Sequence, residues 1–110
     1  MARHKRERLE AKGWRLGTAE EFLGLSDEEN AYVELRLRLA DSLRLRRQRR
    51  NLSQAELARM VRSSQSRIAK MEGGDPSVSL DLLIRTLLAL GTSLPDLARA
   101  VNGQPLAKAG

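Results

Sequence analysis

The sequence predicts an all-α fold, and three observations lead to this prediction. Apolar residues recur at spacings of three and four, as they do on one face of an α-helix. Most of these runs follow a Ser or Thr that can cap a helix, and several show the Ser/Thr-x-x-Glu pattern of a capping box. Short stretches with Gly, Asn or Pro separate the runs and can end helices. The length of 110 residues suits one small domain with flexible ends.

The first part of the chain divides into two segments of opposite charge. Residues 1–17 carry six bases and little apolar repeat, so we expect a flexible basic arm. Residues 18–34 carry six acids and no base, and we expect an acidic helical extension. Thr18 with Glu21 predicts a short first helix in this extension, which Gly24 would end.

A longer helix is expected from Ser26, which can form a capping box with Glu29, to about Arg50. One signal competes, because apolar and charged residues alternate over 33–39 as they would in a half-buried strand. Helix is favoured because residues 27–50 contain no Gly or Pro and because apolar residues repeat at helical spacing: Tyr32, Leu35, Leu39 and Leu43. Trp14 and Tyr32 could each cover the domain's own core or anchor a partner.

Residues 52–74 are the most informative stretch and predict two short capped helices joined by a tight turn. Ser53 and Glu56 form a capping box, so the first helix should begin at Gln54. Ser64 can cap the second helix, whose apolar side is Ile68 with Met71. Four polar side chains of the second helix are left pointing outward: Gln65, Ser66, Arg67 and Lys70. This is the pattern of a DNA-reading helix-turn-helix.

Two further helices are expected after a loop that begins at Gly73. Ser79 precedes an apolar helical run over 80–90, which Gly91 can end in a left-handed conformation, and Leu83, Leu87 and Leu90 supply its buried stripe. Ser93 caps a last short helix over 94–101. Residues 102–110 are expected to form a flexible tail.

Composition limits the classes of function. Twenty Lys and Arg against fourteen acids give a formal charge of +6, which favours a polyanionic partner. One histidine, no cysteine and no glycine-rich phosphate loop leave no catalytic pair, metal cluster or cofactor site to predict, so we expect no enzyme. Nonspecific RNA binding is disfavoured by the lack of aromatic stacking residues. No apolar run approaches the roughly 20 residues that span a membrane, and we expect a cytoplasmic protein.

The residues of 35–101 resemble the Xre, or lambda-repressor-like, helix-turn-helix regulators. The likeness rests on Leu52-Ser53-Gln54, Glu56-Leu57-Ala58, Ser64-Gln65-Ser66, Ile68 and Glu72-Gly73-Gly74. It implies a lambda-repressor-like five-helix DNA-binding domain, here with an N-terminal helical and basic extension. It also implies a sequence-specific repressor that binds a palindromic operator in double-stranded DNA as a homodimer, with recognition helices about 34 Å apart.

The resemblance assigns roles to individual residues. Gln54 would bind a DNA phosphate, and the start of the second helix would meet the major groove through Ser64, Gln65, Ser66, Arg67 and Lys70. Gln can pair twice with adenine and Arg with guanine, each good pair contributing about 1 to 3 kcal/mol of discrimination. Arg47 and Glu72 match a pair that forms an interior ion pair in the family.

This chain departs from the family pattern at two places. Arg62 replaces the usual glycine of the turn, so the turn must accept either a side chain at positive φ or a different geometry. The loop over 73–79 contains no base, so phosphate contacts must come from backbone amides or from elsewhere, the candidates being Arg44, Arg46, Arg49 and Arg50.

A more particular likeness is to small Xre proteins of the HigA-like antitoxin kind, and it rests on Glu21-Phe22-Leu23-Gly24-Leu25-Ser26, Gln65-Ser66-Arg67 and the loop at Asp75-Pro76-Ser77. It implies the antitoxin of a type II toxin-antitoxin pair that autoregulates its operon, with a RelE-like RNase toxin as partner. Four acids are candidates for toxin binding: Glu20, Glu21, Asp27 and Glu28. The helix dipole explains part of this acidic block equally well. The alternative is a solitary Xre-type regulator without a toxin.

Overall fold

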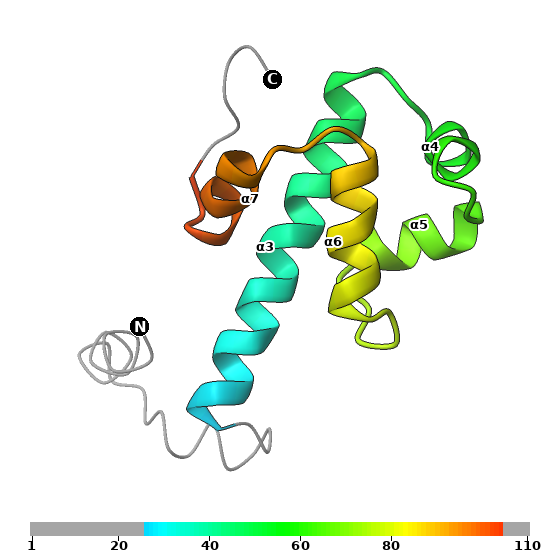
Figure 1. Ribbon diagram of the computed structural model, residues 1–110. Coiled ribbons are helices and arrows are strands. Elements are labelled where there is room, and N and C mark those ends of the chain that lie inside the picture. Colours follow the sequence, from blue (N-terminus) through cyan, green and yellow to red (C-terminus); the bar gives the residue numbers. More distant parts are fainter. Residues whose placement is uncertain (1–25, 105–110) are drawn as a thin grey trace. The chain divides into compact units, whose positions relative to one another are not determined.

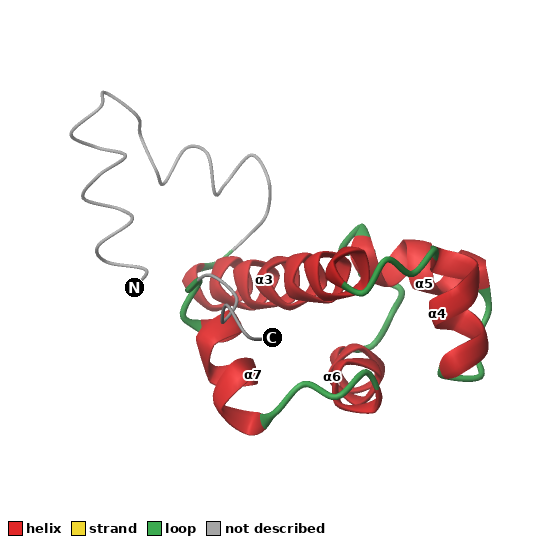
Figure 2. Ribbon diagram, turned by 90° about the horizontal axis from the view of Figure 1, so that it is seen from above, coloured by secondary structure: helices red, strands yellow, loops and turns green. Residues whose placement is uncertain are grey.

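The computed structural model describes residues 26–104, which contain five helices and no strand (Figures 1 and 2). The helices are α3 (Asp27–Arg49), α4 (Gln54–Met60), α5 (Gln65–Glu72), α6 (Leu80–Ala89) and α7 (Leu94–Val101). The all-α prediction is therefore confirmed. The chain divides into two compact units, residues 1–35 and 36–110, and α3 runs from the first into the second. The helix expected after Thr18, and Trp14, lie outside the described residues.

Helix α3 begins and ends where its flanking residues dictate. The main-chain N–H of Ser26 donates to Glu29 Oε1 at 3.2 Å, and the N–H of Glu29 donates to Ser26 Oγ at 3.1 Å, which completes the capping box. The helix then continues without a break to Arg49, so the strand reading of residues 33–39 is wrong. Asn51 follows at a φ of 57°, a left-handed conformation that Asn accepts more readily than most residues.

The apolar stripe of α3 is buried in its C-terminal half. Leu39 and Leu43 are at most 1% exposed, whereas Tyr32 is 47% exposed. Within residues 36–110 the largest fully buried side chains come from all the helices before α7: Leu39, Leu43, Leu57, Ile68, Met71, Leu83 and Leu87. The leucines of α6 thus form the core stripe expected from their spacing, and Gly91 ends that helix at a φ of 98°.

Two arginines of α3 bind α7 within the unit formed by residues 36–110. Arg46 pairs with Asp96 at 3.3 Å near the start of α7, and Arg38 donates to the Val101 carbonyl at its end. The start of α7 therefore lies near the C-terminal end of α3, and the end of α7 lies near the middle of α3. The N-cap Ser93 and the charge of Arg46 both lower the pKa of Asp96.

The turn between α4 and α5 uses a side chain at positive φ. Arg62 has a φ of 56°, so the first of the two alternatives for the missing glycine is the observed one. The N–H of Ser63 donates to the Ala58 carbonyl at 2.8 Å, which closes the turn tightly over the end of α4. A left-handed arginine is strained because its Cβ crowds the backbone.

We expect Arg62→Gly to raise the free energy of unfolding by about 1 kcal/mol, because glycine adopts this φ without the Cβ clash. Urea unfolding followed by circular dichroism measures the change. Arg59→Gly is the matched control, since Arg59 is exposed inside α4 and glycine there should lower stability by about 1 kcal/mol. A destabilised Arg62→Gly protein would contradict the interpretation.

Candidate nucleic-acid interface

Two capping serines fix where the helices of the central motif begin. Ser53 and Glu56 form the expected box, with N–H to oxygen distances of 2.7 and 3.0 Å, so α4 begins at Gln54. The N–H of Ser53 lowers the pKa of Glu56, because its hydrogen bond favours the carboxylate. Ser64 Oγ accepts from the N–H of Arg67 at 3.1 Å and starts α5 at Gln65.

Helix α5 presents two different faces. Ile68 and Met71 are at most 1% exposed and anchor the helix in the core against α4. The four side chains expected to point outward are all exposed: Gln65, Ser66, Arg67 and Lys70. The buried pair therefore determines which side chains α5 offers to a partner.

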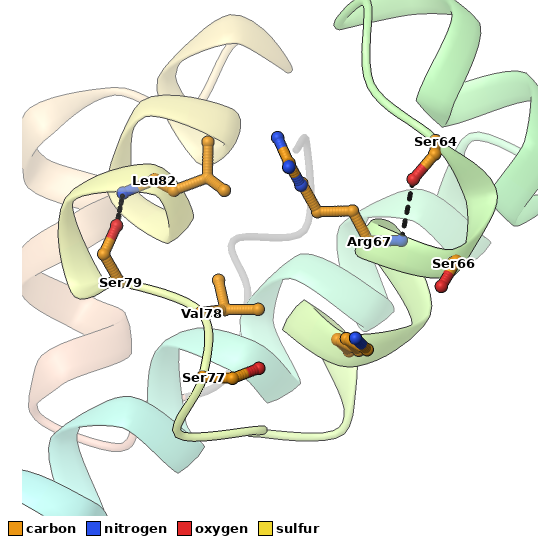
Figure 3. A pocket seen from close by; sticks show the side chains of 8 residues that line it. Ser64, Ser66, Arg67, Ser77, Val78, Ser79 and Leu82 are labelled. Carbon is orange, nitrogen blue, oxygen red and sulfur yellow. Dashed lines mark hydrogen bonds between the residues drawn. The ribbon is translucent and has the colours of Figure 1, made fainter.

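A polar hollow of about 510 Å³ lies beside α5 (Figure 3). One wall is α5 with its cap, and the other is the loop before α6 with the first turn of that helix. The lining residues are Ser64, Ser66, Arg67, Lys70, Ser77, Val78, Ser79 and Leu82. Two cations and four hydroxyls around a concave surface suit a phosphate backbone or base edges. Gln65 is exposed but does not line the hollow.

The far wall of the hollow was missed in the sequence. Val78 and Leu82 belong to no motif in the sequence, Ser77 enters only through the antitoxin likeness, and Ser79 is predicted only as a helix cap. The expected backbone donors of this loop are mostly used inside the protein, because the amides of Gly73, Gly74, Asp75, Ser77 and Val78 all donate to protein oxygens. Serine hydroxyls, rather than these amides, are the polar groups that the loop offers to a ligand.

An ion pair connects the interface to α3. Arg47 Nε donates to Glu72 Oε2 at 2.6 Å, and Arg47 Nη2 donates to Glu72 Oε1 at 3.1 Å. The two side chains are 13% and 4% exposed. The Glu72 carboxylate raises the pKa of Arg47, because it accepts from the charged guanidinium. The pair thus ties the C-terminal end of α5 to α3.

Gln54 belongs to the same network. Its Nε2 donates to Glu72 Oε1 at 3.1 Å, and the side chain is half-buried. An amide nitrogen has two hydrogens, and this bond uses only one of them.

Most arginines of α3 are engaged inside the protein, which corrects part of the expected phosphate set. Arg46 is 12% exposed and pairs with Asp96, so little of its guanidinium faces outward. Arg44 pairs with Asp41 on the same helix. Arg50 lies over Gly91, with its Nη2 3.1 Å from the position of a Cβ there, at the opposite end of α6 from the hollow.

The described residues restrict two other kinds of site. Residues 26–104 hold no group of three or more His, Cys, Asp or Glu side chains that could bind a metal ion. None of the helices α3 to α7 is both long and apolar enough to span a bilayer.

The fold and the outward face of α5 define a DNA-binding protein of the helix-turn-helix class. A family model described as "Helix-turn-helix" matches residues 43–97, which is half of the chain. The chain therefore belongs to this family of Xre-like regulators. No curated protein and no solved structure matches it.

Proposed function

We propose that this protein is a homodimeric repressor that recognises a palindromic operator through α5. The observation that carries the proposal is the division of α5 into a buried apolar face and an exposed polar face beside a cationic hollow. An α-helix fits the major groove, where each base pair presents a distinct pattern of donors and acceptors. Gel shifts with genomic fragments test the proposal, which fails if no fragment is preferred.

Individual residues have separate roles in this proposal. Gln65, on the first turn of α5, pairs with adenine N6 and N7, and Arg67 pairs with guanine O6 and N7. Lys70, Ser64 and Ser66 line the hollow and contact the sugar-phosphate backbone, together with the remaining amide N–H of Gln54.

We expect Gln65→Ala to weaken binding to the preferred duplex by about 1 to 3 kcal/mol and to leave binding to random duplex unchanged. The reason is that Gln65 is exposed and reads a base, whereas random duplex is held through phosphates. Fluorescence anisotropy measures both affinities. Gln104→Ala, an exposed glutamine beyond α7, is the matched control and should change neither. Equal losses on both duplexes would rule out base reading by Gln65.

The homodimer is proposed to form through the outer face of α7. Leu94 is 72% exposed and Val101 is 43% exposed, and with Leu97 they form one stripe at spacings of three and four. Ion pairing and hydrogen bonding to α3 hold the helix at both ends, so the stripe is presented on a fixed element. A two-fold axis at this face would let both α5 helices contact one palindrome.

We further propose that the protein acts as the antitoxin of a type II pair and represses its own operon. The supporting observation is the charge asymmetry of α3, whose first turn carries Asp27, Glu28 and Glu29 while its last turn carries arginines. Glu29 serves the helix cap and Glu28 is exposed, so an acidic surface remains there for a basic RNase. Glu20 and Glu21 lie outside the described residues.

The product of the adjacent gene distinguishes an antitoxin from a solitary regulator. We expect that product to be a small basic RNase that co-purifies with this chain and loses activity in the complex. A neighbouring gene for an unrelated protein, or co-expression without a complex, would favour the solitary regulator.

A further inference from the structure

Helix α3 reaches the DNA-facing loop with residues that the family match does not include. The match begins at residue 43, whereas α3 begins at Asp27. Arg36, in this earlier part, is 7% exposed, and its Nη1 donates to the carbonyl of Val78 in the loop between α5 and α6. Val78 is itself 6% exposed and lines the hollow. A buried charged hydrogen bond therefore joins the part of α3 that precedes the family match to one wall of the hollow.

The next residue of α3 contacts the same loop. Leu37 lies against Gly74, where a Cβ would come within 2.6 Å of Leu37 Cδ2. Gly74 also has a φ of 70°, which glycine adopts without strain. The loop thus packs against α3 at Gly74 and accepts a hydrogen bond from α3 at Val78, four residues later.

Between these two contacts the loop is ordered by Asp75. Its Oδ1 accepts from the N–H of Ser77 at 2.8 Å, and its carbonyl accepts from the N–H of Val78 at 3.1 Å. The Ser77 N–H is the main cause of the lowered pKa of Asp75, and the charges of Lys70 and Arg36 add to it. Arg36 therefore acts on the loop directly through its bond to the Val78 carbonyl.

We propose that Arg36 is a positioning residue of the DNA-binding face. Its bond to Val78 holds Ser77 and Ser79 at a set distance across the hollow from Arg67 and Lys70, so that both walls meet the same DNA strand. This inference rests on the proposed DNA binding and adds a residue to it that the family match does not cover. Two consecutive glycines open the loop, and a tether removes conformational freedom that DNA binding would otherwise have to remove.

The test compares two arginines of the same helix. Arg36→Met removes the donor and keeps most of the apolar stem. Arg38→Met is the matched control, since Arg38 also donates to a main-chain carbonyl, that of Val101, but on the side of α7. Affinity is measured on a half-site duplex, so that dimerisation does not enter the comparison. Amide hydrogen exchange of Ser77 and Val78 reports the order of the loop, and thermal unfolding reports stability.

We expect Arg36→Met to weaken half-site binding about tenfold and to speed exchange at Ser77 and Val78, because a charged hydrogen bond is lost at the loop. Arg38→Met should lose less stability, because its hydrogen bond is exposed, and should bind the half-site within about twofold of the wild type. Arg36→Lys, which keeps the charge, should recover part of the affinity, and it serves as the test variant if Arg36→Met does not fold.

The inference and the proposed function fail in different ways. If the folded Arg36→Met protein binds the half-site as the wild type does, or if exchange at Ser77 and Val78 is unchanged, Arg36 does not position the loop. If the wild type prefers no duplex, the proposed function fails, and the exchange rates still decide whether Arg36 holds the loop.

Discussion

Replacement of Leu94 by aspartate is expected to weaken binding to the palindromic operator by about 10²- to 10⁴-fold, because the second half-site would no longer be bound intramolecularly. Leu94 is 72% exposed on the stripe of α7, so a charge there should be tolerated in the monomer and not in a dimer seam. Affinity for a single half-site should stay unchanged. Analytical ultracentrifugation of the free protein should show the change from dimer to monomer.

Leu88→Asp is the matched control for this experiment. Leu88 is 44% exposed on α6 and does not belong to the α7 stripe, so the variant should remain dimeric. A wild-type protein that sediments as a monomer and binds the operator one-to-one would contradict the dimer. Loss of the dimer in Leu88→Asp alone would place the seam on α6.

Replacement of Glu72 by alanine is expected to lower the free energy of unfolding by about 3 to 5 kcal/mol, the usual cost of leaving one member of a buried ion pair unpaired. Arg47 is only 13% exposed and would lose its carboxylate, and Gln54 would lose the oxygen to which its amide donates. Many small domains have little more stability than this. Urea unfolding at neutral pH measures the change.

The ion pair itself is isolated by a double-mutant cycle. Arg47→Met alone should also destabilise, while the double variant with Glu72→Ala should be less destabilised than the sum of the two single variants. Glu72→Gln keeps one acceptor oxygen and should cost less than Glu72→Ala. A Glu72→Ala protein within about 1 kcal/mol of the wild type would show that the pair does not hold α5 to α3.

The local structure of the interface could be predicted because short-range hydrogen bonds set it. A serine side chain that accepts from the amide three residues later favours a helix start, and the expected caps at Ser26, Ser53, Ser64, Ser79 and Ser93 are all observed. The outward face of α5 followed from the positions of Ile68 and Met71, since a helix buries one side. Arg62 stands where the family has glycine, and the sequence could not decide between a side chain at positive φ and a different turn geometry, because residue type alone does not determine φ.

The interaction partners of the α3 arginines could not be predicted in the same way. Seven arginines of residues 36–50 look equivalent in the sequence, yet four of them contact three different segments: Arg47 contacts α5, Arg36 the loop after it, and Arg38 and Arg46 the two ends of α7. Their partners lie 25 to 63 residues away along the chain. A long flexible side chain has many reachable partners, and only the packing of the helices selects one. Arg46, one of four candidates for a phosphate contact in the sequence, is found paired with Asp96.

By itself, the sequence determined the all-α class, the starts of the helices and the four side chains that α5 turns outward, because each depends on neighbours within about four residues. The tertiary structure decided that Ser77 and Ser79 face Arg67 across one hollow, and that Arg36 supports that loop. These relations join segments far apart in the chain, and the burial of the shared apolar core brings them together.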